Sequence, residues 1–89
     1  SFRSVVLKKT TFGDCRLHEV DFSGADLSGA TLDDCDLAGA VFEGTNLEQA
    51  DLRTAHNFII DPQQNRMKQA RFSASGLPGL LMRYQLVIE

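Results

Sequence analysis

The chain has 89 residues, of which 43% are hydrophobic and 24% are charged, and its formal net charge at pH 7 is −3. A chain of this length forms one domain, and an ordinary compact core of this size would be only marginally stable. The sequence holds no run of eighteen apolar residues and no basic-then-apolar leader, so we expect neither a membrane helix nor a secretory signal.

Charge is distributed unevenly along the chain. Residues 14–52 contain ten acidic residues and a single base, Arg16, whereas the other basic residues lie toward the two ends. A surface of this kind repels the phosphates of nucleic acids. The sequence therefore predicts no direct binding of DNA or RNA.

From the start of the chain, a large apolar residue occupies every fifth position without interruption. These residues are Phe2, Leu7, Phe12, Leu17, Phe22, Leu27, Leu32, Leu37, Phe42, Leu47 and Leu52. A period of five fits neither a helix, which repeats every 3.6 residues, nor a strand, which repeats every two. The chain must therefore turn after every five residues.

The simplest solution is a square coil with four five-residue sides, in which the large residue points at the axis and a small residue fills each corner. Residues twenty apart should then lie over one another, with Phe2, Phe22 and Phe42 in one column and Cys15 beneath Cys35. Such ladders of like residues are typical of solenoids. A six-residue left-handed helix also stacks coils, but its period does not fit.

The repeats resemble a known family. AlaAspLeuSerGly at 25–29, AlaThrLeuAspAsp at 30–34 and AlaAspLeuArgThr at 50–54 are similar to the A(D/N)LXX motif of pentapeptide-repeat proteins. The resemblance implies an all-β fold, a right-handed quadrilateral parallel β-helix, here of about four coils over residues 1–74. Its handedness comes from the resemblance and not from the period.

After residue 55 the motif falters, but its register returns. Met67 lies twenty residues beyond Leu47, so the last coil should be complete but irregular. Asp61 and Pro62 suit the first two positions of a type I turn, which would rebuild one corner there.

From Leu77 onward the apolar spacing becomes helical, and residues 75–89 are expected to form a C-terminal cap and dimerisation tail. Leu77, Leu80, Leu81 and Tyr84 fall on one face of a short α-helix that would cover the open last coil. Two interpretations of the final apolar run remain open: the tail folds back on this helix, or it meets its own copy in a two-fold dimer. The candidate cap and dimer residues are Leu77, Leu80, Leu81, Met82, Tyr84, Leu86, Val87 and Ile88.

Residues 58–66 and 79–88 resemble the C-terminal end of Qnr-type quinolone-resistance proteins and of the immunity protein against a gyrase-poisoning microcin. This resemblance implies a homodimer joined by the C-terminal helix. It also implies an acidic rod that binds DNA gyrase or topoisomerase IV by mimicking duplex DNA. Because the repeat is already in phase at Phe2, we expect either a longer chain or a partner that covers the first coil.

Residues capable of chemistry do not form a catalytic or metal-binding group in this pattern. His18 and His56 fall at different repeat positions and should not stack, so no shared metal site is expected. Cys15 and Cys35 should point inward beside apolar neighbours, which makes neither a good nucleophile. We interpret them as reduced corner residues of a cytoplasmic protein, with a disulfide as the alternative. The sequence thus predicts no enzyme, no metal and no cofactor.

Six acidic residues make up the candidate partner-binding face: Asp14, Asp33, Asp34, Asp36, Glu43 and Glu48. Asp34 should lie one coil above Asp14, where like charges repel, although Arg53 could offset part of the charge. Residues 21–40 hold five acids within one coil of about 4.8 Å rise, whereas duplex DNA carries one charge per about 1.7 Å.

These acids serve a positively charged partner or form a plain solvated surface, and the sequence leaves both interpretations open. The favoured function is a non-enzymatic, DNA-mimicking rod that engages a topoisomerase or another nucleic-acid-binding protein. The alternative is a structural or scaffolding repeat module with no topoisomerase target.

Overall fold

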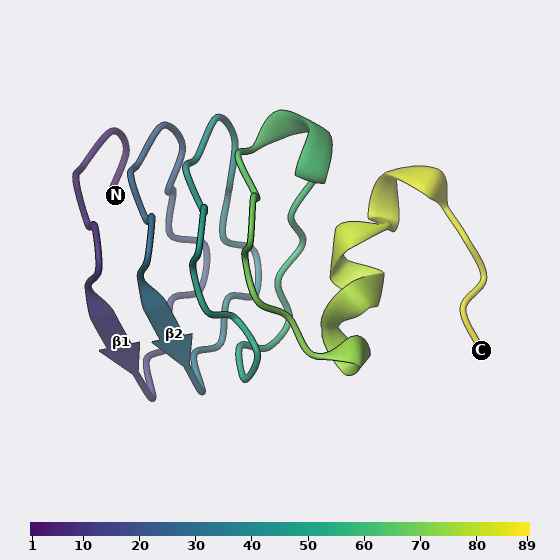
Figure 1. Ribbon diagram of the computed structural model, residues 1–89. Coiled ribbons are helices and arrows are strands. Elements are labelled where there is room, and N and C mark those ends of the chain that lie inside the picture. The colour runs from purple at the N-terminus through teal and green to yellow at the C-terminus, as the bar shows by residue number, and fades with distance from the viewer.

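Parallel backbone pairing between residues twenty apart organises the computed structural model, which describes residues 1–89. Strand β1 (Thr11–Gly13) pairs in parallel with strand β2 (Thr31–Asp33), with Thr11 opposite Thr31. Isolated parallel bridges repeat the same offset along the chain, from Val6 with Asp26 to Asp51 with Arg71. The chain therefore winds as a β-helix solenoid, with its two termini at opposite ends (Figure 1).

Left-handed backbone at a fixed repeat position makes the chain turn. From Phe2 to Leu47, the residue two positions after each axial residue has a positive φ, for example 67° at Gly29 and 61° at Gln49. The next N–H then donates back to the axial carbonyl, as from Ala30 to Leu27 at 3.0 Å. Glycine adopts this conformation without strain, but the solenoid also imposes it on Lys9 and Asp34.

The residue just before the axial position supports the same turn through its side chain. The Oδ1 atom of Asp26 accepts a hydrogen bond from the Ser28 N–H at 3.0 Å, and Asn46 accepts one from Glu48 in the same way. Asp and Asn are suited to such local bonds to a backbone N–H two residues on. The preference of the motif for Asp or Asn here is therefore structural.

The core is a shaft of stacked axial side chains, as the period of five predicts. Phe2, Phe22 and Phe42 stack with ring centroids 5.6 and 5.2 Å apart. Burying one such side chain contributes about 1.5–3 kcal/mol relative to leaving it exposed. The fully buried axial residues are Phe22, Leu27, Leu32, Leu37 and Leu47, with Leu52 at 1% exposed.

Small residues fill the corners between these columns, and their polar atoms are satisfied. The hydroxyl of buried Thr45 donates to the Phe22 carbonyl at 2.9 Å, and the thiol of Cys35 points at the carbonyls of Phe12 and Asp33. Both Cys15 and Cys35 are free thiols. The expected inward orientation of Cys35 is confirmed, since it is fully buried, whereas Cys15 is half-buried.

The predicted irregularity after residue 55 is a shift of the buried residue by one position. Asn57, which stands where Leu37 stands one coil earlier, turns early with a φ of 61°. Phe58 enters the core in its place and is only 5% exposed. The expected turn at Asp61 and Pro62 is a 3-10 helix, η1 (Pro62–Gln64), capped by the Asp61 side chain.

Asn65 then ties the irregular segment to the coil below through its side-chain amide. Its Oδ1 accepts from the Thr45 N–H at 2.9 Å, while its Nδ2 donates to the carbonyls of Phe42 and Asp61. Backbone pairing resumes with the bridge between Asn46 and Arg66. The predicted return of the register is confirmed.

The expected α-helix near the C-terminus is wrong in type and in starting point. The segment forms two 3-10 helices, η2 (Ala74–Leu80) and η3 (Met82–Tyr84). Pro78 lacks an N–H, and glycines at 76 and 79 have low helix propensity, so the tighter 3-10 geometry replaces regular α-helical bonding. Figure 1 shows this segment beyond the last turn of the solenoid.

A close backbone contact joins the C-terminal segment to the coil. The carbonyl of Gly79 accepts a hydrogen bond from the Ile60 N–H at 2.9 Å, and Leu80 packs against the core. A Cβ atom added to Gly79 would lie 2.4 Å from the Phe58 carbonyl oxygen. Only glycine permits this approach.

Gly79→Ala should lower the free energy of unfolding by about 1–3 kcal/mol, because the added methyl group must displace backbone. Urea unfolding followed by circular dichroism measures the loss. Gly13→Ala is the matched control, since a Cβ atom there meets no atom within 4 Å. Equal losses in the two variants would contradict the proposed contact.

Candidate functional site

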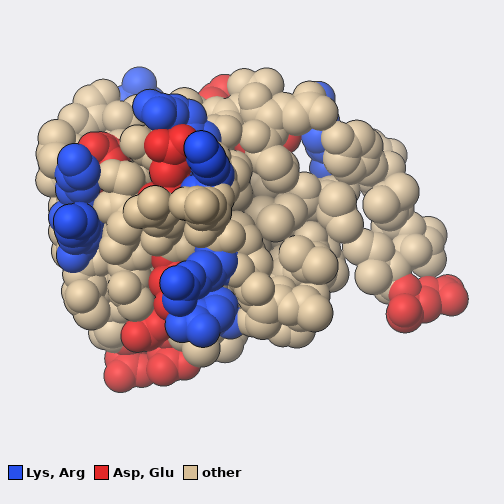
Figure 2. Space-filling model, in the orientation of Figure 1, with Lys and Arg blue, Asp and Glu red and all other residues tan.

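Three of the predicted partner-binding acids gather where strands β1 and β2 end. Asp33 is the last residue of β2, and its carbonyl accepts the N–H of Asp14 at 3.0 Å. Asp34 follows with the same left-handed backbone as Asp14, at φ 53° and 51°. All three side chains are exposed and none forms an ion pair. Acidic atoms gather at this edge in Figure 2, and we call Asp14, Asp33 and Asp34 the acidic edge.

Asp36 lies around the next corner and is already engaged. Its carboxylate lies 2.7 Å from His18 Nε2 and accepts hydrogen bonds from the Asn57 amide and the Ala38 N–H. The hydrogen bond from His18, followed by that from Asn57, lowers the pKa of Asp36 to about 2. The Asp36 carboxylate is therefore occupied by contacts within the coil and is not free to bind a partner.

The two glutamates of the predicted face lie elsewhere on the coil. Glu48 pairs with Arg66 at 3.1 Å. Glu43 is exposed and lines a shallow hollow with Arg3 and Gly24, beside the phenylalanine column. The structure thus brings together three of the six acids and disperses the others.

Arg53 does not approach the acidic edge as closely as its position above Asp33 suggested. Its guanidinium instead donates two hydrogen bonds to Asp51, at 3.1 and 2.8 Å. These bonds lower the pKa of Asp51 and raise the pKa of Arg53. The acidic edge consequently has no bound cation of its own.

A spacing of eighteen explains the ion pairs that a search at spacing twenty does not find. Arg3 pairs with Asp21, His18 with Asp36, and Glu48 with Arg66, and each pair is eighteen residues apart. In each, a residue just after one axial position reaches a residue just before the axial position of the next coil. Opposite charges at this spacing would have been the signal in the sequence.

The remaining reactive side chains have structural surroundings. Burial raises the pKa of the Cys35 thiol, which keeps it in the less nucleophilic form. No three histidine, cysteine, aspartate or glutamate side chains come together as metal ligands. The helices are all too short and insufficiently apolar to cross a membrane.

The C-terminal segment carries the largest group of exposed apolar side chains. Leu86, Val87 and Ile88 are 57%, 85% and 53% exposed, so the tail does not bury them by folding back on the helix. Leu80 and Leu81 are half-buried, whereas Leu77, Met82 and Tyr84 are exposed. A groove of about 290 Å³ between η2, η3 and the tail is lined mainly by Pro78, Leu81, Met82, Leu86 and Ile88.

Hydrogen bonds tie this segment to the irregular part of the coil. Arg83 lies 3.1 Å from Asp61 and also donates to the Gln63 side chain at 2.8 Å. The amide of Gln63 donates in turn to the Tyr84 hydroxyl at 3.1 Å. These contacts hold the apolar tail at one end of the molecule.

Comparison with known proteins agrees with the repeat pattern. The model of the pentapeptide repeats matches residues 1–37 and 15–53, with eight copies. No protein of curated function matches the chain in sequence.

Two trypsin-treated variants of QnrB1, a plasmid-mediated fluoroquinolone resistance protein, are 21% identical with a TM-score of 0.46, over 94% of this chain and 42% or 43% of theirs. The pentapeptide repeat protein Rfr23 from the cyanobacterium Cyanothece 51142 is 26% identical with a TM-score of 0.35, over 80% of this chain and 48% of its own. The chain therefore spans less than half the length of these proteins.

Replacing Asp36 by Asn should reduce the loss of stability that occurs as the pH falls from about 4 to about 2. Because the pKa of Asp36 is lowered to about 2 from 3.8, its stabilising contribution is present above pH 3.8 and is lost as the pH falls through 2. Asn suits the position, because Asn46 occupies the same repeat position and accepts the equivalent hydrogen bond from the Glu48 N–H.

The measurement is the melting temperature between pH 2 and pH 5 for wild type and variant. Asp14→Asn is the control, at an exposed carboxylate without an ion pair. If Asp36→Asn and Asp14→Asn change the pH profile equally, the His18–Asp36 contact does not stabilise the fold.

Proposed function

Because this chain belongs to the pentapeptide-repeat family, we propose that it binds a partner protein and does not catalyse a reaction. The turn after every five residues and the pairing at spacing twenty support the geometry of that family: a right-handed quadrilateral coil of about four turns with a C-terminal cap. Its reactive side chains are used for structure, as with His18 on Asp36 and the thiol of Cys35 in a corner.

The proposed partner is a positively charged, nucleic-acid-binding protein such as DNA gyrase or topoisomerase IV. The observation that carries this proposal is the acidic edge, where carboxylates on neighbouring coils are exposed without ion pairs. Their mutual repulsion costs stability unless a cationic surface offsets it. A partner that binds the phosphates of duplex DNA offers such a surface.

Charge density also supports this proposal, although ion pairs reduce the number of unpaired acids. Of the five acids in residues 21–40, Asp21 pairs with Arg3 and Asp36 with His18, which leaves three. Three charges in a rise of about 4.8 Å amount to one per about 1.6 Å, comparable with the one charge per about 1.7 Å of duplex DNA. Asp36 and Glu48 would add charge only by leaving their present partners.

A supercoiling assay with purified gyrase tests this function. The chain should inhibit supercoiling, or protect the enzyme from a quinolone, at micromolar concentration. Asp33→Lys combined with Asp34→Lys should weaken the effect about tenfold or more, because attraction becomes repulsion.

Glu19→Lys is the control, since Glu19 is an exposed acid without an ion pair at the same repeat position as Asp34. If wild type has no effect, or if both variants behave like wild type, the topoisomerase proposal is wrong. A scaffolding role without that target then becomes the better interpretation.

We further propose that the exposed apolar surface of the C-terminal segment joins two copies of the chain. Val87 is 85% exposed and Leu86 57%, and such a contiguous apolar surface is unusual for a monomer. A two-fold axis would let helix and tail bury their own copies, with Leu77, Leu80, Leu81, Met82 and Tyr84 near the seam.

Sedimentation should therefore give two chains per particle. Leu86→Asp or Ile88→Asp should give one, with an unchanged far-ultraviolet circular dichroism spectrum, because each places a charge in the apolar contact. Val6→Asp is the control, since Val6 is 72% exposed and shares its repeat position with Asp26. A wild-type monomer, or a dimer that survives both tail variants, would rule out this seam.

The location of the protein is proposed from its thiols. Cys15 and Cys35 are free, although they belong to one corner column. Free thiols persist in reducing compartments, which supports a cytoplasmic protein.

A further inference from the structure

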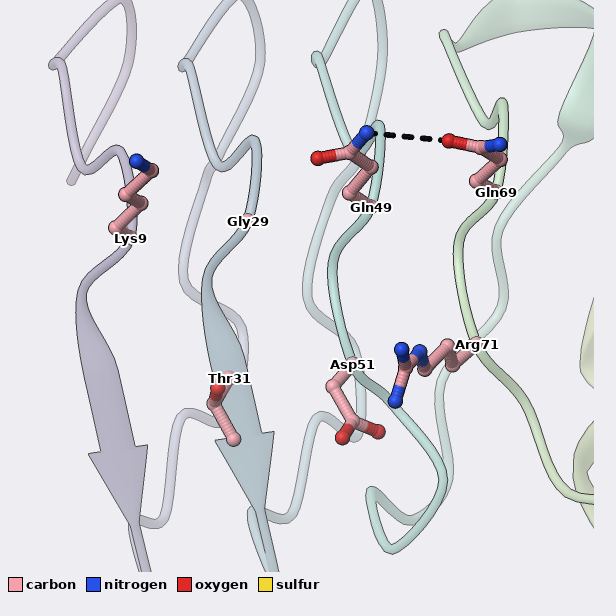
Figure 3. Close-up of a pocket in the computed structure, with 7 residues that line it drawn as sticks. All are labelled: Lys9, Gly29, Thr31, Gln49, Asp51, Gln69 and Arg71. Atoms are coloured by element: carbon pink, nitrogen blue, oxygen red, sulfur yellow. Dashed lines mark hydrogen bonds between the residues drawn. The ribbon is translucent and has the colours of Figure 1, made fainter.

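A polar groove opens at the start of strand β2, whereas the acidic edge lies at its end. Its volume is about 740 Å³, and none of its lining residues is hydrophobic. Figure 3 shows the seven residues that line it: Lys9, Gly29, Thr31, Gln49, Asp51, Gln69 and Arg71.

The groove follows from the repeat. One wall is the series of left-handed turn residues, such as Lys9 and Gln49, and the other includes Thr31 and Asp51, which face each other across a parallel bridge. Ala30 and Ala50, which lie between these walls, are small and fully buried, so the floor is low. Gly29 has no side chain, which leaves the centre of the groove open.

Lys9 and Arg71 give the groove a net positive charge. Neither forms an ion pair, whereas the carboxylate of Asp51 already accepts two hydrogen bonds from Arg53, which lies outside the groove. The backbones of Lys9 and Arg71 lie toward opposite ends of the groove, and the Arg71 guanidinium extends toward Asp51 (Figure 3). Figure 2 shows further basic side chains on the same face of the coil.

Two glutamine amides continue the wall of the groove that begins with Lys9 (Figure 3). The Gln49 amide donates to the Gln69 side chain at 3.1 Å, so the amide nitrogen of Gln69 is left for a ligand. Gln49 and Gln69 also line an adjoining hollow with Lys68, which forms no ion pair either. The groove therefore offers a cation on its first coil, a cation on its last coil, and neutral amides along the wall from Gln49 to Gln69.

We propose that this groove binds an extended acidic segment of a protein partner, independently of what the acidic edge binds. The backbones of Lys9 and Arg71 lie three coils apart, or about 14 Å along the axis. Two carboxylates four residues apart on an extended peptide are about 13 Å apart. Such a peptide reaches both cations, while its backbone bonds to the amides of Gln49 and Gln69.

Other anions fit the groove less well. One phosphate group is too small to contact both cations across about 14 Å. Single-stranded nucleic acid is normally held by aromatic side chains that stack on its bases, and the groove has none. The net charge of −3 also repels a long polyanion more than a short acidic peptide.

The test is a nuclear magnetic resonance titration of the isotope-labelled chain at low ionic strength. The probe is a glycine- and serine-rich peptide of about nine residues with two glutamates four residues apart; its control has glutamines instead. Saturable shifts should appear at the amides of Gly29, Thr31, Gln49 and Gln69, and not with the control peptide.

Two sets of variants separate charge from shape. Lys9→Gln with Arg71→Gln should weaken binding about tenfold, the combined effect of two exposed ion pairs. Glutamine suits position 9 because the same left-handed turn holds Gln49 and Gln69. Gly29→Gln should also weaken binding, since it fills the open centre and keeps both cations. Arg16→Gln, at an exposed base that does not line the groove, should change nothing.

Four outcomes would overturn the proposal. The first is the absence of saturable shifts with millimolar peptide. The second is equal binding by wild type and the double variant. The third is that inorganic phosphate gives the same shifts at the same concentration, which indicates a simple anion site. The fourth is that a single-stranded oligonucleotide binds the groove more tightly than the peptide.

Discussion

Pairing of each backbone segment with the segment twenty residues away is the constraint on which the whole structure depends. The N–H groups and carbonyls of one coil are satisfied by its neighbours, so a slip of one residue would break the ladder. It would also carry axial leucines such as Leu27 and Leu32 out of the shaft and replace them with polar residues. Hydrogen bonding and burial therefore specify the same register, and this agreement stabilises a chain with very short strands.

This constraint explains why the columns could be predicted from the sequence. A period of five and a stack at twenty are properties of residue order alone, and they correctly place the phenylalanine column and the buried corner at Cys35. The C-terminal helix type could not be predicted in the same way. It depends on Pro78 within the helix and on the close approach of Gly79 to Phe58. The second of these is visible only in the packed structure.

The candidate sites were predictable only in part, because charge patterns depend on how far side chains reach. Spacing twenty correctly brings Asp14 near Asp33 and Asp34, but His18 reaches Asp36 diagonally, and Arg53 bends back to Asp51. The polar groove was missed entirely. Its signal was a glycine at 29 between a lysine and a glutamine at the same repeat position, which reads as an ordinary turn residue until the neighbouring coil is placed beside it.

The amide of Asn65 has a consequence for how this molecule can change. Its oxygen accepts from the Thr45 N–H and its nitrogen donates to the Phe42 carbonyl, so the amide bridges two groups that bond directly to each other in a regular turn, as Ala50 and Leu47 do. The Gln64 carbonyl still accepts the Gly44 N–H at 2.7 Å, whereas the exposed Pro62 and Gln63 form no backbone hydrogen bond with the coil below. Extra residues inserted there would lengthen a surface loop and leave the stacked layers on either side in place, which makes this one corner a site where the family's uniform rod can acquire an individual shape.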